Sequence, residues 1–192
     1  INLRARTMTA PDPETSDETE SLDIDIVVKD SRWATAMDDV IETCRAAACA
    51  AFSAGISKPL VAEAAVVLAD DDFVAALNRQ YRGRDGATNV LSFAATGPGD
   101  PEIPAVASVP ALLGDIIVAR ETTVREAAAV GISIEHHLRH LVVHGMLHLL
   151  GFDHMTDEEA AEMEPLETQV LATMGVADPY RDDADRPAEA HP

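Results

Sequence analysis

Residues 144–154 read His144-Gly-Met-Leu-His148-Leu-Leu-Gly151-Phe-Asp153-His154. On a helix with about 3.6 residues per turn, His144 and His148 lie one turn apart on the same face, so their imidazoles can converge on one ion. On a continuous helix, His154 would lie about 15 Å beyond His144 and off that face. Gly151 has the permissive backbone at which helices commonly end. The segment therefore predicts a helix, a glycine turn and a third ligand.

Three imidazoles in this arrangement are typical of a catalytic zinc site, which has three protein ligands and keeps a fourth position for water. We therefore predict one Zn²⁺ per chain, bound by His144, His148 and His154. Three imidazoles also suit nickel or copper, so the physiological metal stays open. Chance placement of histidines on an apolar helix is the alternative. It is weakened because most histidines of the chain lie between residues 136 and 154.

Three further histidines precede the motif on the same predicted helix. His140 continues the row of His144 and His148, but about 12 Å of helix rise separates it from His148, too far for both to bind one ion. We interpret His136, His137 and His140 mainly as surface groups, and otherwise as side chains that orient the ligands.

The spacing H-x-x-x-H-x-x-G-x-x-H is also that of the metzincin metalloproteases, which carry a glutamate base directly after the first histidine. In this chain that position is Gly145. A glycine cannot accept a proton from the metal-bound water. The sequence therefore disfavours ordinary metzincin peptidase chemistry but leaves the metal site intact.

The composition predicts one compact domain. A chain of 192 residues with 47% hydrophobic residues is long enough to bury a sizeable core. No apolar run approaches the roughly 18 residues that a membrane span needs, and residues 1–20 carry acids rather than a secretion signal. We therefore expect a cytoplasmic protein with no membrane partner.

The formal net charge of −20 disfavours a simple nucleic-acid-binding surface, because phosphate affinity comes largely from Lys and Arg. Any site for a polyanion must then be a local patch. The candidates are the arginines Arg79, Arg82 and Arg84, together with Arg120, Arg125 and Arg139.

Hydrophobic periodicity predicts an alternation of strands and helices. Strands are expected over residues 22–28, 61–68, 90–93 and 112–118. Helices are expected over residues 32–52, from a cap at Asp70 or Asp71 through Tyr81, over residues 121–130, from Ser133 through the central histidines, and from a capping box at Thr156 to about Met174. Residues 96–111, rich in Pro and Gly, predict a loop. Residues 1–21 predict a disordered acidic tail, and residues 177–192 a second acidic tail.

Residues 77–93 form a second informative stretch, Leu77-Asn-Arg-Gln-Tyr-Arg82-Gly-Arg84-Asp-Gly-Ala-Thr-Asn89-Val-Leu-Ser-Phe93. A turn rich in Gly and Arg precedes a β-prone segment, so cationic side chains should lie at the mouth of a strand. The alternative is a helix end at which basic residues compensate the helix dipole.

Together with Leu113-Gly114-Asp115-Ile, these two stretches resemble the YbeY family of bacterial endoribonucleases, also called rRNA maturation factors. The match covers about residues 22–175, and Phe152 stands where the family often has Tyr. The resemblance implies a single α+β domain over residues 22–176. In such a domain a small mixed β-sheet packs against helices, and the central helix carries the three-histidine metal site.

The resemblance also implies roles for individual residues and a substrate. His144, His148 and His154 correspond to the zinc ligands, and Arg82 to the functional arginine beside the metal cleft. The implied activity is cleavage of single-stranded RNA, in 16S rRNA 3′-end maturation and ribosome quality control. The implied partners are rRNA and the ribosome or its small-subunit components, and DNA is not expected.

The proton acceptor stays open at this point. The candidates are zinc-bound hydroxide itself, the 2′-hydroxyl of the substrate acting as the nucleophile, and Asp153. We interpret Asp153 as a residue of the turn that orients a histidine rather than as a base. The alternatives for the whole protein are a metal-dependent hydrolase of a non-RNA substrate, such as a peptide, and a module in which zinc only stabilises the fold.

Overall fold

The computed structural model describes residues 20–95 and 109–181. The elements in chain order are β1 (Ser21–Val28), α1 (Trp33–Ala36), α2 (Val40–Gly55), β2 (Val61–Ala69), α3 (Asp71–Leu77), the π-helix η1 (Asn78–Arg82), β3 (Val90–Ala94), β4 (Ala111–Ala119), α4 (Arg120–Val130), α5 (Ile134–Leu149) and α6 (Asp157–Thr173).

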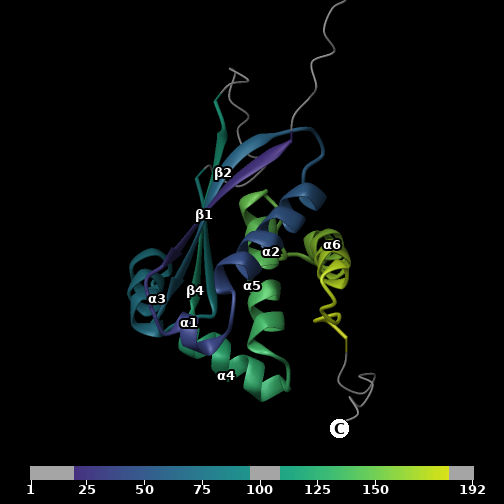
Figure 1. Ribbon diagram of the computed structural model, residues 1–192. Helices are drawn as coiled ribbons and strands as arrows, with labels where there is room; N and C mark the ends of the chain where they lie inside the picture. Colours follow the sequence, from purple (N-terminus) through teal and green to yellow (C-terminus); the bar gives the residue numbers. More distant parts are fainter. Residues whose placement is uncertain (1–19, 96–108, 182–192) are drawn as a thin grey trace, which may run out of the picture.

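Four strands form one mixed sheet in the order β1-β2-β4-β3. Strands β1, β2 and β4 are parallel, and β3 runs antiparallel to β4. Helices α2 and α5 cover one face of the sheet, α3 lies on the other side, and α6 packs on α5 away from the sheet (Figure 1). The expected α+β fold with a small mixed sheet is therefore confirmed.

Helix α5 is the central element of the domain. It packs against α2, α4, α6, β3 and β4. Its apolar residues are buried in the main core: Leu138, Leu141, Val142, Val143, Met146, Leu147 and Leu149. A helix held on several sides in this way can present its polar side chains with little freedom.

Side-chain N-caps mark the first turns of three helices. Asp70 accepts a hydrogen bond from the backbone N–H of Phe73 at the start of α3, and Ser133 accepts one from His136 at the start of α5. Thr156 forms the predicted capping box at the start of α6. These caps satisfy backbone N–H groups that otherwise have no partner in the first helical turn.

The prediction of one continuous helix over residues 32–52 is wrong, because this segment forms two helices, α1 and α2. Asp39 adopts a left-handed conformation with φ of 46° and separates α1 from α2. Trp33 on α1 is fully buried, and its indole N–H donates to the carbonyl of Ala69 at 3.1 Å. The break lets this large side chain reach the core while α2 keeps its own packing against β1 and α5.

Some sequence predictions fall outside the described residues. Of the loop predicted over residues 96–111, residues 96–108 are not described. Of the two predicted tails, residues 1–19 and 182–192 are not described. Within the described ranges, no helix combines the length and apolar character needed to cross a membrane.

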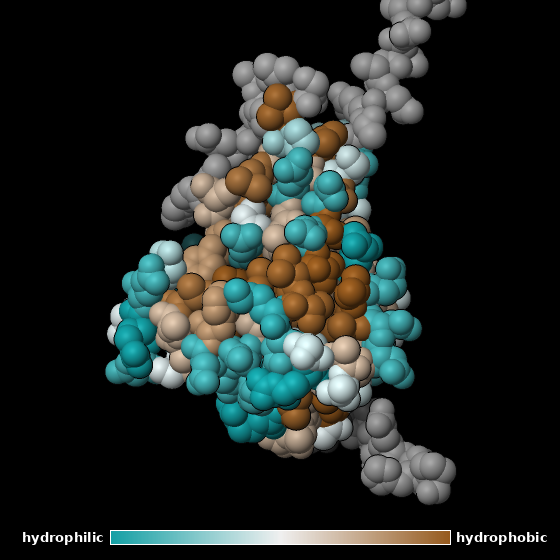
Figure 2. Space-filling view, turned by 60° about the vertical axis from the view of Figure 1, so that its left-hand side comes forward, coloured by the Kyte–Doolittle hydropathy of each residue, from teal (hydrophilic) through white to brown (hydrophobic). Residues whose placement is uncertain are grey.

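Hydrophobic residues also reach the surface. Figure 2 shows them gathered near the centre of one face, with hydrophilic residues around and below them. Exposure of apolar atoms is normal for folded proteins, so this face does not by itself indicate a partner.

Gly114 allows β4 to bring β3 into the sheet. The register between β2 and β4 shifts there, because Glu63 pairs with Leu112 whereas Ala64 pairs with Gly114. Gly114 has a φ of +127°, and a Cβ atom on it would lie 2.0 Å from the carbonyl oxygen of Phe93 in β3. Only glycine fits this position without moving backbone.

We expect Gly114→Ala to lower the free energy of unfolding by about 2–3 kcal/mol, because the new methyl group meets backbone and the φ angle is unfavourable. Urea unfolding of the metal-free protein measures this loss. Gly131→Ala is the matched control, since Gly131 also has a positive φ, +71°, but a Cβ atom added there would meet no other atom within 4 Å. It should lose about 1 kcal/mol. Equal losses in the two variants would contradict a clash at Gly114.

Candidate metal centre and cleft

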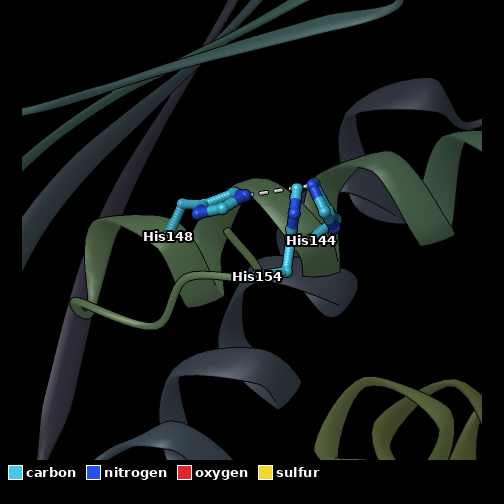
Figure 3. Close-up of side chains that lie close together, drawn as sticks. All are labelled: His144, His148 and His154. Atoms are coloured by element: carbon cyan, nitrogen blue, oxygen red, sulfur yellow. Dashed lines mark hydrogen bonds between the residues drawn. The ribbon is translucent and has the colours of Figure 1, made fainter. Parts of the chain in front are cut away.

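The three predicted ligands converge at the end of α5. His144 and His148 lie on the last turns of the helix, and Gly151, with a φ of +94°, turns the chain so that His154 returns to them. Figure 3 shows the three imidazoles turned toward one another. Their ring centroids are 4.6 Å apart for His144 and His148, 5.2 Å for His144 and His154, and 5.0 Å for His148 and His154.

The spacing of the nitrogen atoms suits one metal ion. One ligand nitrogen from each histidine lies within 4.8 Å of the others. The Nε2 atoms of His144 and His148 are 3.1 Å apart. Two nitrogens bound to one tetrahedral zinc at about 2.0–2.1 Å would be separated by about 3.3–3.4 Å, so only a small adjustment is needed.

The opposite nitrogens of these two rings already face acceptors. Nδ1 of His148 lies 2.9 Å from the carbonyl oxygen of Phe152, and Nδ1 of His144 lies 3.3 Å from Oε2 of Glu167. With the proton on Nδ1 donated to these oxygens, the Nε2 lone pairs are directed into the site. The residues present therefore fit a divalent metal ion. The acceptor for Nδ1 of His148 is the backbone carbonyl of Phe152. This hydrogen bond therefore does not depend on whether residue 152 is Phe or Tyr.

The lowered pKa of His148 suits a metal-binding role. Burial, and to a lesser degree the neighbouring His144, lower its pKa to about 4. It is therefore neutral near pH 7, which is the form that binds a metal.

Glu167 is a functional candidate that our sequence analysis missed. Its side chain on α6 is fully buried. Burial alone would raise the pKa of the carboxyl, but its contacts with His140 and His144 outweigh burial and lower the pKa to about 2. The sequence holds a signal for it, because Glu167 lies on the same face of α6 as the buried Met163, Val170 and Leu171.

The interpretation of the preceding histidines as mainly surface groups is wrong for two of them. His137 is buried, and its Nε2 lies 2.9 Å from Oε2 of Glu126 on α4. His140 is partly buried, with Nε2 2.8 Å from Oε1 of Glu167. Both contacts join α5 to another helix, and helical periodicity alone does not reveal how two helices pack together.

Asp153 belongs to the turn that carries the third ligand. Its Oδ1 accepts a hydrogen bond of 2.8 Å from the backbone N–H of His154. The carboxylate therefore orders the backbone of this turn, and both residues are exposed.

The histidines open into a cleft of about 1090 Å³. Strand β3 forms one wall through Val90, Ser92 and Ala94, which point to the same side because side chains alternate along a strand. The turn after α5 contributes residues 151–155, the last residue of η1 contributes Arg82, and the segment after η1 contributes Arg84.

Two of the six candidate arginines reach this cleft. Arg82 and Arg84 line it, and within the described residues neither guanidinium group forms a hydrogen bond or an ion pair. The other four are paired with acids: Arg79 with Asp85, Arg120 with Asp30 and Glu121, Arg125 with Asp71, and Arg139 with Glu135. The predicted local patch is thus reduced to two unpaired guanidinium groups beside the histidines.

The cleft differs in charge from the chain as a whole. Arg82 and Arg84 balance the acids Asp153 and Glu159 on its lining, whereas the whole chain has a net charge of −20. A divalent ion at the histidines would make the cleft positive. A phosphate group would then find a favourable potential here.

Gly145 faces the sheet. A Cβ atom there would lie 2.7 Å from Cγ2 of Ile116 and 3.1 Å from Oγ of Ser92. Helix α5 therefore approaches β3 and β4 so closely that no side chain fits. The hydroxyl of Ser92 donates to the carbonyl oxygen of Gly145 across this contact, at 3.3 Å. The packing explains physically why the peptidase base is absent at this position.

A family model described as endoribonuclease YbeY matches residues 19–175. The endoribonuclease YbeY of Paramagnetospirillum magneticum is 48% identical, over 84% of this chain and 98% of its own length. That of Azorhizobium caulinodans is 49% identical, over 83% of this chain and 96% of its own length. A solution structure from Thermotoga maritima is 22% identical, covers 83% of this chain and 99% of its own, and has a TM-score of 0.46.

We expect the protein to bind one divalent ion per chain and His154→Ala to weaken that binding by more than about 100-fold. Even a group that only orients a ligand contributes about 10–100-fold, and a ligand itself contributes more. Competition with a chromophoric chelator measures the affinity. His136→Ala, on α5 but outside the cluster, should bind like the wild type. Unchanged affinity in His154→Ala would remove this residue from the ligand set.

Proposed function

The chain belongs to the endoribonuclease YbeY family, and from this premise we propose that it is a zinc-dependent endoribonuclease that cuts single-stranded RNA. The observation that supports the proposal most is the composition of the cleft. Three convergent histidines and two unpaired arginines line the same cavity. This pairs a site for a metal with groups that bind phosphate.

The histidines would hold the ion and leave a position open toward the cleft. When bound, zinc supplies Lewis-acid chemistry, polarising a phosphoryl oxygen and lowering the pKa of water toward about 7. A structural zinc usually has four protein ligands and is closed. Three histidines beside an open cleft therefore favour a catalytic role over a purely structural one.

Arg82 would stabilise the charge that develops on the phosphate. Its guanidinium is always protonated and can form two parallel hydrogen bonds to phosphate oxygens. A phosphodiester gains negative charge on its equatorial oxygens as the fifth ligand approaches phosphorus, and a fixed cation stabilises this state more than the ground state. Arg84, which is also unpaired within the described residues, would hold the adjoining backbone.

The proton acceptor is a group other than residue 145, because Gly145 has no side chain and faces the sheet. The 2′-hydroxyl of the substrate can serve as the nucleophile in RNA cleavage. Asp153 lines the cleft, but one of its oxygens is engaged by the backbone of His154. We assign Asp153 to holding the turn rather than to proton transfer.

The biological substrate that we propose is 16S rRNA at its 3′ end, together with RNA of defective ribosomes, acted on in the cytoplasm. The support is the family resemblance, and ribosome or small-subunit components are the partners that follow from it. A transcript ending in the 3′ region of the 16S precursor should therefore be shortened by the purified protein. DNA of the same sequence should stay intact.

A hydrolase of a non-RNA substrate is the competing function. The packing at Gly145 argues against peptide hydrolysis by a metzincin-like route, and the two unpaired arginines favour a phosphate-containing substrate. A panel of peptides tested with the metal-loaded protein distinguishes the two. Peptide hydrolysis with RNA left intact would support the competing function.

We expect Arg82→Ala to lower kcat/KM for a labelled single-stranded RNA by about 10²–10³-fold, the usual loss when one group that stabilises developing charge is removed. Metal content and thermal stability should stay unchanged, because the guanidinium of Arg82 has no partner within the described residues. Arg79→Ala is the matched control, since Arg79 pairs with Asp85 and does not line the cleft. Equal cleavage by wild type, Arg82→Ala and His148→Ala would indicate a contaminating nuclease.

A further inference from the structure

Glu167 is a buried carboxylate outside the predicted ligand set. It projects from α6 toward α5, and its relative exposure is 0%. A buried charge is costly unless its partners compensate for the lost hydration. Its position therefore needs an explanation beyond packing, and its contacts supply one.

The first contact is with a metal-ligand candidate. Oε2 of Glu167 lies 3.3 Å from Nδ1 of His144, on the side of the ring opposite to the nitrogen that faces His148. A carboxylate in this position fixes both the tautomer and the orientation of a metal-binding imidazole. It does so without touching the ion.

Two further residues hold the carboxylate itself. The phenol of Tyr180 donates a hydrogen bond of 2.6 Å to Oε2. Nε2 of His140 lies 2.8 Å from Oε1, an electrostatic contact because Oε1 does not reach hydrogen-bond geometry. His140 is one helical turn before His144 on α5, so the carboxylate bridges two successive turns of the helix that carries the ligands.

Tyr180 is itself fixed in place. Oδ1 of Asp178 accepts a hydrogen bond of 2.9 Å from the backbone N–H of Tyr180, and one of 3.3 Å from the hydroxyl of Thr168 on α6. The segment after α6 thus folds back onto its own helix. Three parts of the chain, α5, α6 and this segment, meet at Glu167.

A second metal site is the competing explanation, because His140, His144 and Glu167 also lie close enough to hold an ion. His144 would then have to bind one ion through each ring nitrogen. The hydroxyl of Tyr180 already occupies Oε2 of Glu167. Both points favour a carboxylate that supports one site over a carboxylate that binds a second ion.

We propose that Glu167 is a positioning residue for His144, and that Tyr180 and His140 hold its carboxylate in place. Glu167 keeps Nε2 of His144 directed at the metal and thereby raises the affinity of the three-histidine site. The inference deepens the proposed function, since it concerns the same centre, but its test measures metal binding and not RNA cleavage.

The test uses the full chain and the isosteric variant Glu167→Gln. Its zinc dissociation constant, measured by chelator competition, should rise about 10–100-fold, the usual effect of losing a carboxylate that orients a ligand. The visible spectrum of the cobalt-loaded variant should also change, because the position of His144 around the ion changes. Glu162→Gln, an exposed site on α6, is the matched control and should behave like the wild type.

Tyr180→Phe removes only the hydroxyl that holds Glu167. It should weaken zinc binding in the same direction as Glu167→Gln but by a smaller factor. This variant also decides the matter if Glu167→Gln does not fold, which circular dichroism of the metal-free protein would show. In that case, unchanged zinc affinity in Tyr180→Phe would overturn the proposal.

Two other results would overturn it. One is a zinc affinity and cobalt spectrum of folded Glu167→Gln that match those of the wild type. The other is two ions per wild-type chain with one lost in Glu167→Gln, which would establish a second metal site instead. If the wild type fails to cleave RNA while Glu167→Gln still loses zinc affinity, only the proposed function fails.

Discussion

The close packing of α5 against the sheet is the constraint on which the rest of the structure depends. At Gly145 the helix backbone lies directly on Ile116 of β4 and Ser92 of β3. An extra methyl group would push the helix away from the sheet, because protein interiors are too densely packed to absorb it. This contact fixes α5 beside β3, whose alternate residues form the wall of the cleft. The same glycine that leaves no room for a peptidase base thus sets the distance between the histidine cluster and the opposite wall of the cleft.

An acidic chain can still form a binding site for phosphate. Most of its candidate arginines are paired with acids, but the two that stay unpaired lie together. Four of the six candidate arginines are paired with carboxylates. Arg82 and Arg84 lie at the end of the π-helix η1, and Gly83 between them adopts a left-handed conformation with φ of +64°. Buried Asn78 ties this turn to the carbonyl oxygen of Gly86 at 2.9 Å. The π-helix and the left-handed Gly83 therefore place Arg82 and Arg84 in the same cleft as the histidines.

The sequence predicted those features that arise within a few residues of each other. The spacing of His144, His148 and Gly151 determines where the third ligand returns, and the caps at Ser133 and Thr156 follow from local hydrogen bonds. The features that it missed depend on how separate elements pack against each other. The break at Asp39 follows from the burial of Trp33 under Ala69. The pairings of His137 with Glu126 and of His140 with Glu167 join helices whose relative placement periodicity does not specify.

The row of histidines on α5 has two different functions along its length. The first two, His137 and His140, meet carboxylates from α4 and α6 and so attach the neighbouring helices. The last two, His144 and His148, face each other through Nε2. Because the row follows one face of the helix, the contacts that fix the rotation of α5 also fix the directions of His144 and His148. Metal sites tolerate errors of only about 0.5 Å in their ligands, so a helix anchored by its own histidines holds the site more accurately than caps or loops alone.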